Sequence, residues 1–101
     1  MLDKTMATFD EAVAGVKDGD IILIGGFGAS AVPTELLQAL LRQGAGDLTV
    51  VNNNAGNGPF GLSELIAAGR VRKVICSYAR SSNPVEPNQV AFAGAWRAGR
   101  V

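Results

Sequence analysis

Neutral hydrogen-bond donors gather in two short runs of this chain. The first is a glycine run at 25–28, GGFG, followed by the small residues ASA at 29–31. Glycine lacks the Cβ that holds a ligand away from the backbone, so its N–H can closely approach a phosphate or a thioester. The second is NNNAGNG at 52–58, whose side-chain amides donate hydrogen bonds without carrying charge. Together the two runs predict a small-molecule site.

Each run also has a simpler structural interpretation. Glycines after a strand can serve only to let the strand and the next helix pack closely. Asparagine and glycine favour turns and left-handed backbone, and this interpretation is the better one for Asn52 and Asn57. Asn53 and Asn54 are the stronger candidates, because they would lie beside the glycine run at one edge of a sheet.

Other residue types offer less chemistry. The single cysteine, Cys76, lies in an apolar strand and is predicted to be core rather than a nucleophile. Arg80 follows that strand and either binds a substrate carboxylate or a phosphate or is simply solvated. Glu86 lies in a loop with no catalytic context. The chain has no histidine, which excludes a histidine base or metal ligand here, and no metal site is predicted.

The apolar pattern predicts alternating helices and strands around these runs. A capping box at Thr8 and Glu11 starts the first helix, and glycines or Gly-containing turns end the first three. Strands are predicted at 21–24, 48–51 and 71–77, with the first buried on both faces. Helices are predicted at 9–17, 33–43, 62–68 and, from a weaker pattern, 88–98.

Strands that alternate with helices imply an α/β fold with a parallel, Rossmann-like sheet and flanking helices. The loops after the strands then open on one edge of the sheet, where such folds bind ligands. The last residues look like a helix end that leads into a further strand, which predicts that residues 1–101 form a partial domain.

The overall composition excludes several classes of partner. Nine basic and nine acidic residues cancel, so neither nucleic acid nor an anionic membrane surface is predicted as a partner. No stretch reaches 18 apolar residues. One cysteine excludes an internal disulfide and favours a cytoplasmic location.

A dinucleotide site is one alternative, because residues 26–31 match GxGxxG/A after a strand. An NAD(P)-binding Rossmann domain of an oxidoreductase also needs an acidic residue at the end of the second strand. Asp47 has the right spacing but lies at the start of that strand, and asparagines occupy its end. A non-catalytic, truncated module is the other alternative.

With both runs considered together, the chain resembles family I coenzyme A-transferases. Residues 18–33, DGDIILIGGFGASAVP, are similar to the first signature of that family: a turn, an apolar strand, Gly-Gly-Phe, three variable residues and Gly-x-Pro. Residues 47–62 and 71–78 resemble its A (α) subunit, and NNAGNG at 53–58 is most similar to the 3-oxoadipate:succinyl-CoA members. Ala31 departs from the signature, where glycine is usual.

The resemblance implies a fold and a reaction. The fold would be the NagB-like CoA-transferase fold, with this chain as the N-terminal half of the α subunit. In the family, the nucleophile that attacks the acyl-CoA thioester is a glutamate of the B (β) subunit, which implies a hetero-oligomer of the two subunits. The substrates would be succinyl-CoA and 3-oxoadipate or another 3-oxo acid, and coenzyme A would be a substrate rather than a bound cofactor.

The resemblance also implies roles for individual residues. Asn53 and Asn54 would donate hydrogen bonds to the reacting acyl group. The residues implied to line the coenzyme A site are Gly25, Gly26, Phe27, Gly28, Ala29, Ser30 and Ala31.

Overall fold

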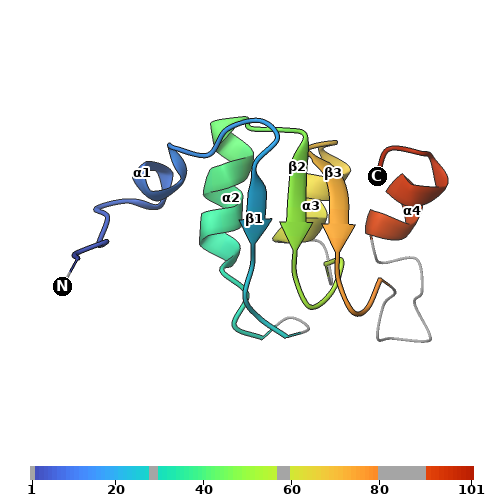
Figure 1. Cartoon of the computed structure of the whole chain (residues 1–101), viewed down its shortest axis with the longest axis horizontal. Coiled ribbons are helices and arrows are strands. Elements are labelled where there is room, and N and C mark those ends of the chain that lie inside the picture. The colour runs from blue at the N-terminus through green and yellow to red at the C-terminus, as the bar shows by residue number, and fades with distance from the viewer. Residues whose placement is uncertain (1, 28–29, 57–59, 80–90) are drawn as a thin grey trace.

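The chain folds into three strands and four helices that alternate along the sequence. The computed structural model describes residues 2–27, 30–56, 60–79 and 91–101 (Figure 1). The elements are α1 (Phe9–Val13), β1 (Ile21–Leu23), α2 (Thr34–Gln43), β2 (Leu48–Val51), α3 (Leu62–Ala67), β3 (Val71–Ile75) and α4 (Ala91–Arg97). This order is the predicted one, although most elements are shorter than predicted.

The strands form one parallel sheet in the order β1-β2-β3. Leu23 pairs with Val51, and Val51 pairs with Ile75, so side chains of the three strands stand in rows across the sheet. Helix α2 connects β1 to β2, and α3 connects β2 to β3. The predicted α/β class with a parallel sheet and flanking helices is therefore confirmed.

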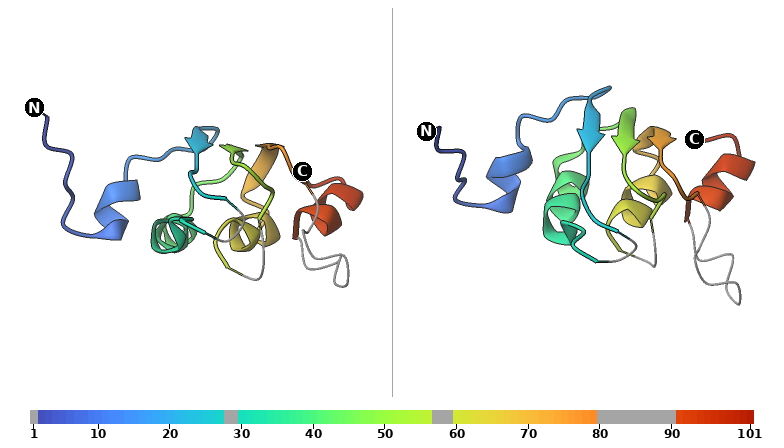
Figure 2. Two further views of the ribbon diagram at one scale, coloured as in Figure 1. Left: turned by 90° about the horizontal axis from the view of Figure 1, so that it is seen from below. Right: turned by 60° about the horizontal axis from the view of Figure 1, so that its bottom comes forward.

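The helices α2, α3 and α4 form a single layer on one face of the sheet (Figure 2). The core lies between that layer and the strands, and its fully buried side chains include Leu48, Leu62, Leu65, Ile66, Val50 and Val71. The other face of the sheet carries no helix in the described part of the chain. Ile21, Leu23 and Ile75 on the strands are 65%, 78% and 47% exposed. The prediction that the first strand is buried on both faces is therefore wrong.

Helix α1 starts as predicted but ends early. The Thr8 hydroxyl accepts a hydrogen bond from the Glu11 N–H at 3.1 Å, which caps the helix. The helix ends at Val13 instead of near residue 17. The Gln43 side chain donates to the carbonyls of Val13 at 3.3 Å and Val16 at 2.6 Å. These carbonyls therefore have partners outside a helix, and the chain can turn toward β1.

The third strand and the last helix also differ from the prediction. Strand β3 ends at Ile75, and Cys76, predicted as core, is only half-buried. Helix α4 begins at Ala91, while residues 88–90 lie outside the described residues. Among the helices described, none combines the length and the apolar character that crossing a membrane requires.

Candidate functional site

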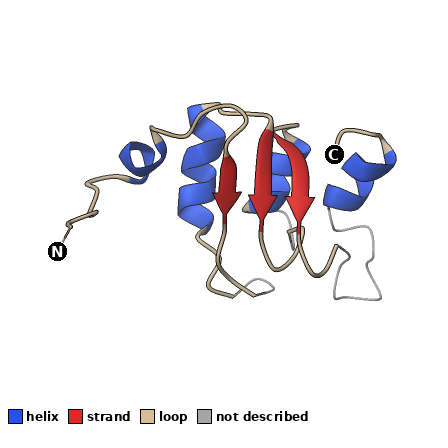
Figure 3. Cartoon of the chain, viewed as in Figure 1, coloured by secondary structure: helices blue, strands red, loops and turns tan. Residues whose placement is uncertain are grey.

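The loops that follow the three strands leave the sheet at the same edge (Figure 3). The first and second loops meet at Gly61, where an added Cβ would lie 3.9 Å from Cγ1 of Val32. The second and third loops are joined by backbone hydrogen bonds. The N–H groups of Ser77 and Tyr78 donate to the Asn53 carbonyl at 3.0 and 3.2 Å, and the Ala55 N–H donates to the Tyr78 carbonyl at 3.1 Å. The three loops therefore lie next to one another at one edge of the sheet, and the sequence predicts that they open there.

The glycine run turns back on itself immediately after β1. Phe27 and Ser30 exchange two backbone hydrogen bonds, each 2.9 Å long. Gly26 has φ of +112°, and a Cβ there would lie 2.7 Å from Cγ2 of Val32, so only glycine fits this turn. Ala31 also has a left-handed backbone, with φ of +58°. This explains why the resemblance leads one to expect glycine at that position.

The hydrogen bonds within this turn occupy some of its backbone N–H groups and leave others for a ligand. The N–H groups of Phe27 and Ser30 are occupied within the loop. No hydrogen bond joins the N–H of Gly25 or Gly26 to another described residue, and Gly25 is exposed. The N–H of Ala31 likewise donates to no described residue, so Gly25, Gly26 and Ala31 are the available amides of the predicted set, while Gly28 and Ala29 lie outside the described residues.

The three asparagines of the second loop have different surroundings. Asn52 and Asn54 are buried, and their side-chain oxygens accept hydrogen bonds from the N–H groups of Asn53 and Gly56, each at 2.8 Å. Asn53 is half-buried, and its side-chain amide bonds to no other residue in the described ranges. The Asn52 and Asn54 oxygens thus take part in hydrogen bonds within the loop, whereas the Asn53 side-chain amide has no described partner. Asn57 lies outside the described residues.

The start of α3 packs closely against this loop, a feature that the sequence reasoning missed. A Cβ on Gly56, which has φ of +95°, would lie 2.7 Å from the Ser63 hydroxyl. That hydroxyl is buried and makes no hydrogen bond to a described residue, as is also true of one carboxylate oxygen of Glu64. A sequence signal for the burial of Ser63 was available, because Ser63 lies within the apolar helical stripe of Leu62, Leu65 and Ile66.

The donors at this edge of the sheet are mostly neutral. The titratable side chains that follow the strands or start the helices here are Cys76, Tyr78, Glu35 and Glu64 within the described residues. That part of the chain also holds no group of three or more histidine, cysteine, aspartate or glutamate side chains arranged to bind a metal. Arg80 and Glu86 lie outside the described residues. The arrangement can bind an acyl group and stabilise an oxyanion through uncharged donors.

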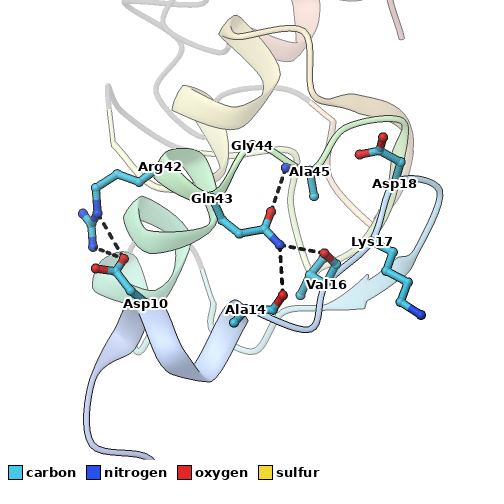
Figure 4. Close-up of a pocket in the computed structure, with 9 residues that line it drawn as sticks. All are labelled: Asp10, Ala14, Val16, Lys17, Asp18, Arg42, Gln43, Gly44 and Ala45. Atoms are coloured by element: carbon cyan, nitrogen blue, oxygen red, sulfur yellow. Dashed lines mark hydrogen bonds and ion pairs between the residues drawn. The ribbon is translucent and has the colours of Figure 1, made fainter.

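A hollow of about 800 Å³ lies at the other end of the molecule, between α1, the turn before β1 and the end of α2 (Figure 4). Most of its polar groups already bond to one another. Arg42 contacts the Asp10 carboxylate at 2.8 Å, and the Asp18 carboxylate accepts from the Gly46 N–H at 2.8 Å. Gln43 joins the segment that follows α1 to the turn that follows α2 across this hollow. These contacts hold elements together, so the loops at the opposite edge are the better candidate site.

The position of Asp47 argues against a dinucleotide site. It precedes β2, has φ of +53°, and its carboxylate lies 3.6 Å from Nε of Arg72. It is therefore at the edge of the sheet away from the glycine turn. Asn52, Asn53 and Asn54 follow β2 where a Rossmann site needs an acidic residue for the ribose.

A family model supplies the deciding observation. The model for coenzyme A transferases matches residues 6–100. The chain belongs to the coenzyme A transferase family. The sequence-based assignment to this family is therefore confirmed, and the oxidoreductase alternative is not supported.

Individual relatives agree with the family assignment. The chain is 45% identical over all 101 residues to the A subunit of 3-oxoadipate CoA-transferase from Pseudomonas putida. It is 40% identical over 77 residues to the A subunit of succinyl-CoA:3-ketoacid coenzyme A transferase from Helicobacter pylori strain J99. These matches cover 100% and 76% of this chain, but only 42% and 33% of the relatives. The chain thus spans less than half the length of these relatives.

A solved structure shows the same fold in another protein. The chain matches the crystal structure of a cysteine-to-serine variant of the decarboxylase AibA/AibB with a TM-score of 0.76 and 24% identity. The match covers 94% of this chain and 36% of the other. At this level of identity the likeness shows the fold, and it confirms the predicted arrangement of strands and helices.

Proposed function

We propose that this chain is the N-terminal part of the α subunit of a two-subunit enzyme that transfers coenzyme A from succinyl-CoA to 3-oxoadipate. The observation that carries the proposal is the edge where Gly25, Gly26 and the Asn53 side chain leave uncharged donors available. Family membership and the names of the relatives support the choice of reaction and substrates. We propose a cytoplasmic location for the reaction, which the single cysteine favours.

The proposed chemistry divides the work between two subunits. A glutamate of the β subunit first attacks the thioester carbonyl and expels the coenzyme A thiolate, which leaves a mixed anhydride. The thiolate then attacks the glutamyl carbon of the anhydride, which releases succinate and leaves an enzyme thioester. The same steps in reverse, with 3-oxoadipate, regenerate the glutamate and form the product thioester.

This chain would stabilise the charge that develops in those steps. Each attack turns a carbonyl oxygen into an oxyanion, which neutral donors can stabilise without first neutralising the glutamate nucleophile. The Asn53 carboxamide is the proposed oxyanion donor. The N–H groups of Gly25 and Gly26 would hold the coenzyme A part of the substrate.

Reconstitution tests the proposed function. The chain in its full natural length is mixed with the β subunit, and succinyl-CoA plus 3-oxoadipate is assayed for exchange. We expect transfer only when both subunits are present. The absence of transfer to 3-oxoadipate and to every other 3-oxo acid tried would contradict the proposal. Titration with NADH against coenzyme A, followed by fluorescence, separates the transferase from a dinucleotide-binding protein.

Replacement of Asn53 tests the oxyanion role. We expect Asn53→Ala to lower kcat by about 10²- to 10³-fold, the usual cost of one lost oxyanion donor, with a much smaller effect on coenzyme A binding. The control is Gln38→Ala, which removes the same functional group from α2. If the Asn53→Ala enzyme had the same kcat as the wild type, Asn53 would not be the oxyanion donor.

A further inference from the structure

The two ends of the molecule carry opposite charge. The molecule is 45 Å long, with α1 at one end of this axis and α4 at the other (Figure 1). Residues 2–20, which contain α1 and the segments on both sides of it, hold five acidic and two basic residues, a net charge of −3. Residues 91–101 hold two arginines and no acidic residue. Although the whole chain is neutral, one end is therefore acidic and the other basic.

The basic end also presents a large aromatic side chain. Trp96 lies in α4 and is 64% exposed, whereas its neighbour Ala95 is buried. Arg97 and Arg100, which we call the α4 arginines, follow Trp96, are exposed, and make no ion pair with another described residue. Tryptophan and arginine are enriched among the residues that contribute most to protein–protein contacts, so this end has the composition of a docking surface.

The acidic end contains a hollow with apolar walls. The hollow has a volume of about 600 Å³ and lies between the segment before α1, α1 itself and α2. Met6, Phe9 and Leu36 line it, and Met6 and Phe9 are 53% and 49% exposed. We call it the α1 groove. Methionine and phenylalanine side chains make favourable contacts with an aromatic ring, so these walls suit an indole.

The charge around the α1 groove favours a basic partner. Arg42, which lines the groove, is neutralised by the Asp10 carboxylate at 2.8 Å. Lys4 also lines the groove, but Asp3 precedes it, and Glu11 on α1 makes no ion pair with a described residue. These five residues together leave one negative charge, opposite in sign to the charge beside Trp96.

We propose that Trp96 of one copy of this chain inserts into the α1 groove of a second copy. Both halves of the contact are present on this chain, which identifies a second copy as the partner. The α4 arginines would face the acidic residues around the groove, so that apolar surface meets apolar surface and each charge meets its opposite. Because the two surfaces differ, the contact is heterologous, and each copy keeps one end free for a further copy. The contact uses neither donor run, so it does not depend on the proposed function.

Sedimentation velocity of the chain in its full natural length measures this self-association. We expect the weight-average mass to rise with concentration between about 10 and 500 μM, because a contact of this size is weak. Raising NaCl from about 50 to about 500 mM should weaken the association at least about threefold, since salt screens the charges.

Replacement of Trp96 tests the apolar centre of the contact. We expect Trp96→Ser to weaken the association at least about tenfold, as truncation of a central aromatic contact does. The matched control is Phe60→Ser, because Phe60 is 62% exposed but lies in the second loop, away from both ends. The control should change the association by less than about twofold. Trp96→Phe, which keeps an aromatic ring, should retain most of the affinity.

Charge reversal at each end tests the pairing of the two surfaces. Arg97→Glu/Arg100→Glu makes the α4 end acidic, and Asp3→Arg/Glu11→Arg makes the end with the α1 groove basic. We expect each double variant to remain monomeric alone, because like charges then face one another in every contact. A mixture of the two should associate, because each contact between unlike copies joins opposite charges again.

Three results would overturn the proposal. The first is a wild-type chain that stays monomeric at about 500 μM, because the two surfaces would then be covered by something other than a second copy. The second is a Trp96→Ser chain that associates like the wild type. The third is a mixture of the two charge variants that remains monomeric, provided that circular dichroism and the Tm show both variants to be folded.

Discussion

At the scale of single residues, Ala31 is under strain that its side chain causes. Its φ of +58° costs an ordinary residue about 1–2 kcal/mol, and glycine avoids that cost. Glycine also raises the conformational entropy of the unfolded chain, and this offsets about 0.5–1 kcal/mol of the stability gained by removing the strain. The difference favours glycine at this position.

We therefore expect Ala31→Gly to raise the free energy of unfolding by about 0.5–1 kcal/mol in urea denaturation. The same substitution at Ala12, inside α1, should lower it by a similar amount, because the backbone there is right-handed. A less stable Ala31→Gly protein would show that Ala31 does not adopt the left-handed conformation in solution.

The site could be predicted in part from residue types. The sequence predicts both donor runs and places them at one edge of the sheet, because parallel strands end there. It does not distinguish Asn53 from Asn54, since both favour the same turns. Only the contacts of the folded loop show that the Asn54 oxygen is held by Gly56 while the Asn53 side chain bonds to no other described residue.

At the scale of elements, Gln43 holds three segments together at the end of α2. Its side chain donates to the Val16 carbonyl at 2.6 Å and accepts from the Ala45 N–H at 2.7 Å. We expect Gln43→Ala to lower the free energy of unfolding by about 1–2 kcal/mol, because each such hydrogen bond contributes about 0.5–1.5 kcal/mol. Gln38→Ala, on the same helix, is the control and should change stability by less than about 0.5 kcal/mol. Equal effects of the two substitutions in thermal unfolding would contradict this role of Gln43.

Arg70 stabilises the same end of α2 from the turn before β3. Its guanidinium donates to the carbonyls of Leu40 and Leu41 at 3.2 and 2.6 Å and to that of Ala45 at 3.1 Å. A cation there also opposes the negative end of the helix dipole. We expect Arg70→Met to destabilise the protein by about 1.5–3 kcal/mol, the range for hydrogen bonds from a charged group.

Arg72→Met is the matched control for Arg70. Arg72 is exposed, and its ion pair with Asp47 is 3.6 Å long, so its loss should cost less than about 1 kcal/mol. Chemical denaturation of both variants separates the two arginines. If Arg72→Met lowered the free energy of unfolding as much as Arg70→Met, the loss of a positive charge, and not the loss of contact with the end of α2, would account for the destabilisation.

Element type and order were predictable because helical periodicity and strand runs differ clearly in this chain. Element length was less predictable. Helix α1 stops at Val13, whose carbonyl accepts both from the Val16 N–H at 3.1 Å and from the Gln43 side chain at 3.3 Å. Gln43 is 30 positions away from Val13, so no local pattern contains the second contact. Burial of β1 was overestimated for a related reason, since an apolar run cannot show whether one or both faces of a strand are covered.

At the scale of the whole molecule, the sheet is covered on one face only. Leu23 is 78% exposed on the uncovered face, whereas Val50 is fully buried under the helices. We expect Leu23→Thr to change the free energy of unfolding by less than about 0.5 kcal/mol. Val50→Thr should lower it by about 1–3 kcal/mol, because its hydroxyl would be buried without a partner.

Urea denaturation of both threonine variants checks this asymmetry. If Leu23→Thr destabilised the protein as much as Val50→Thr, the uncovered face would be buried in solution, and the arrangement of one helix layer on the sheet would not describe the free chain.

The order of strands in the sheet is the same as their order along the chain. Each of β2 and β3 therefore pairs with the strand that precedes it along the chain, so a partner for it already exists when it is made. On a ribosome, β1 and α2 would have emerged before β2, and β2 and α3 before β3, so the sheet can grow one βα unit at a time. This fold is thus suited to assembly during its own synthesis, with the donor-bearing loops completed in sequence as each strand joins.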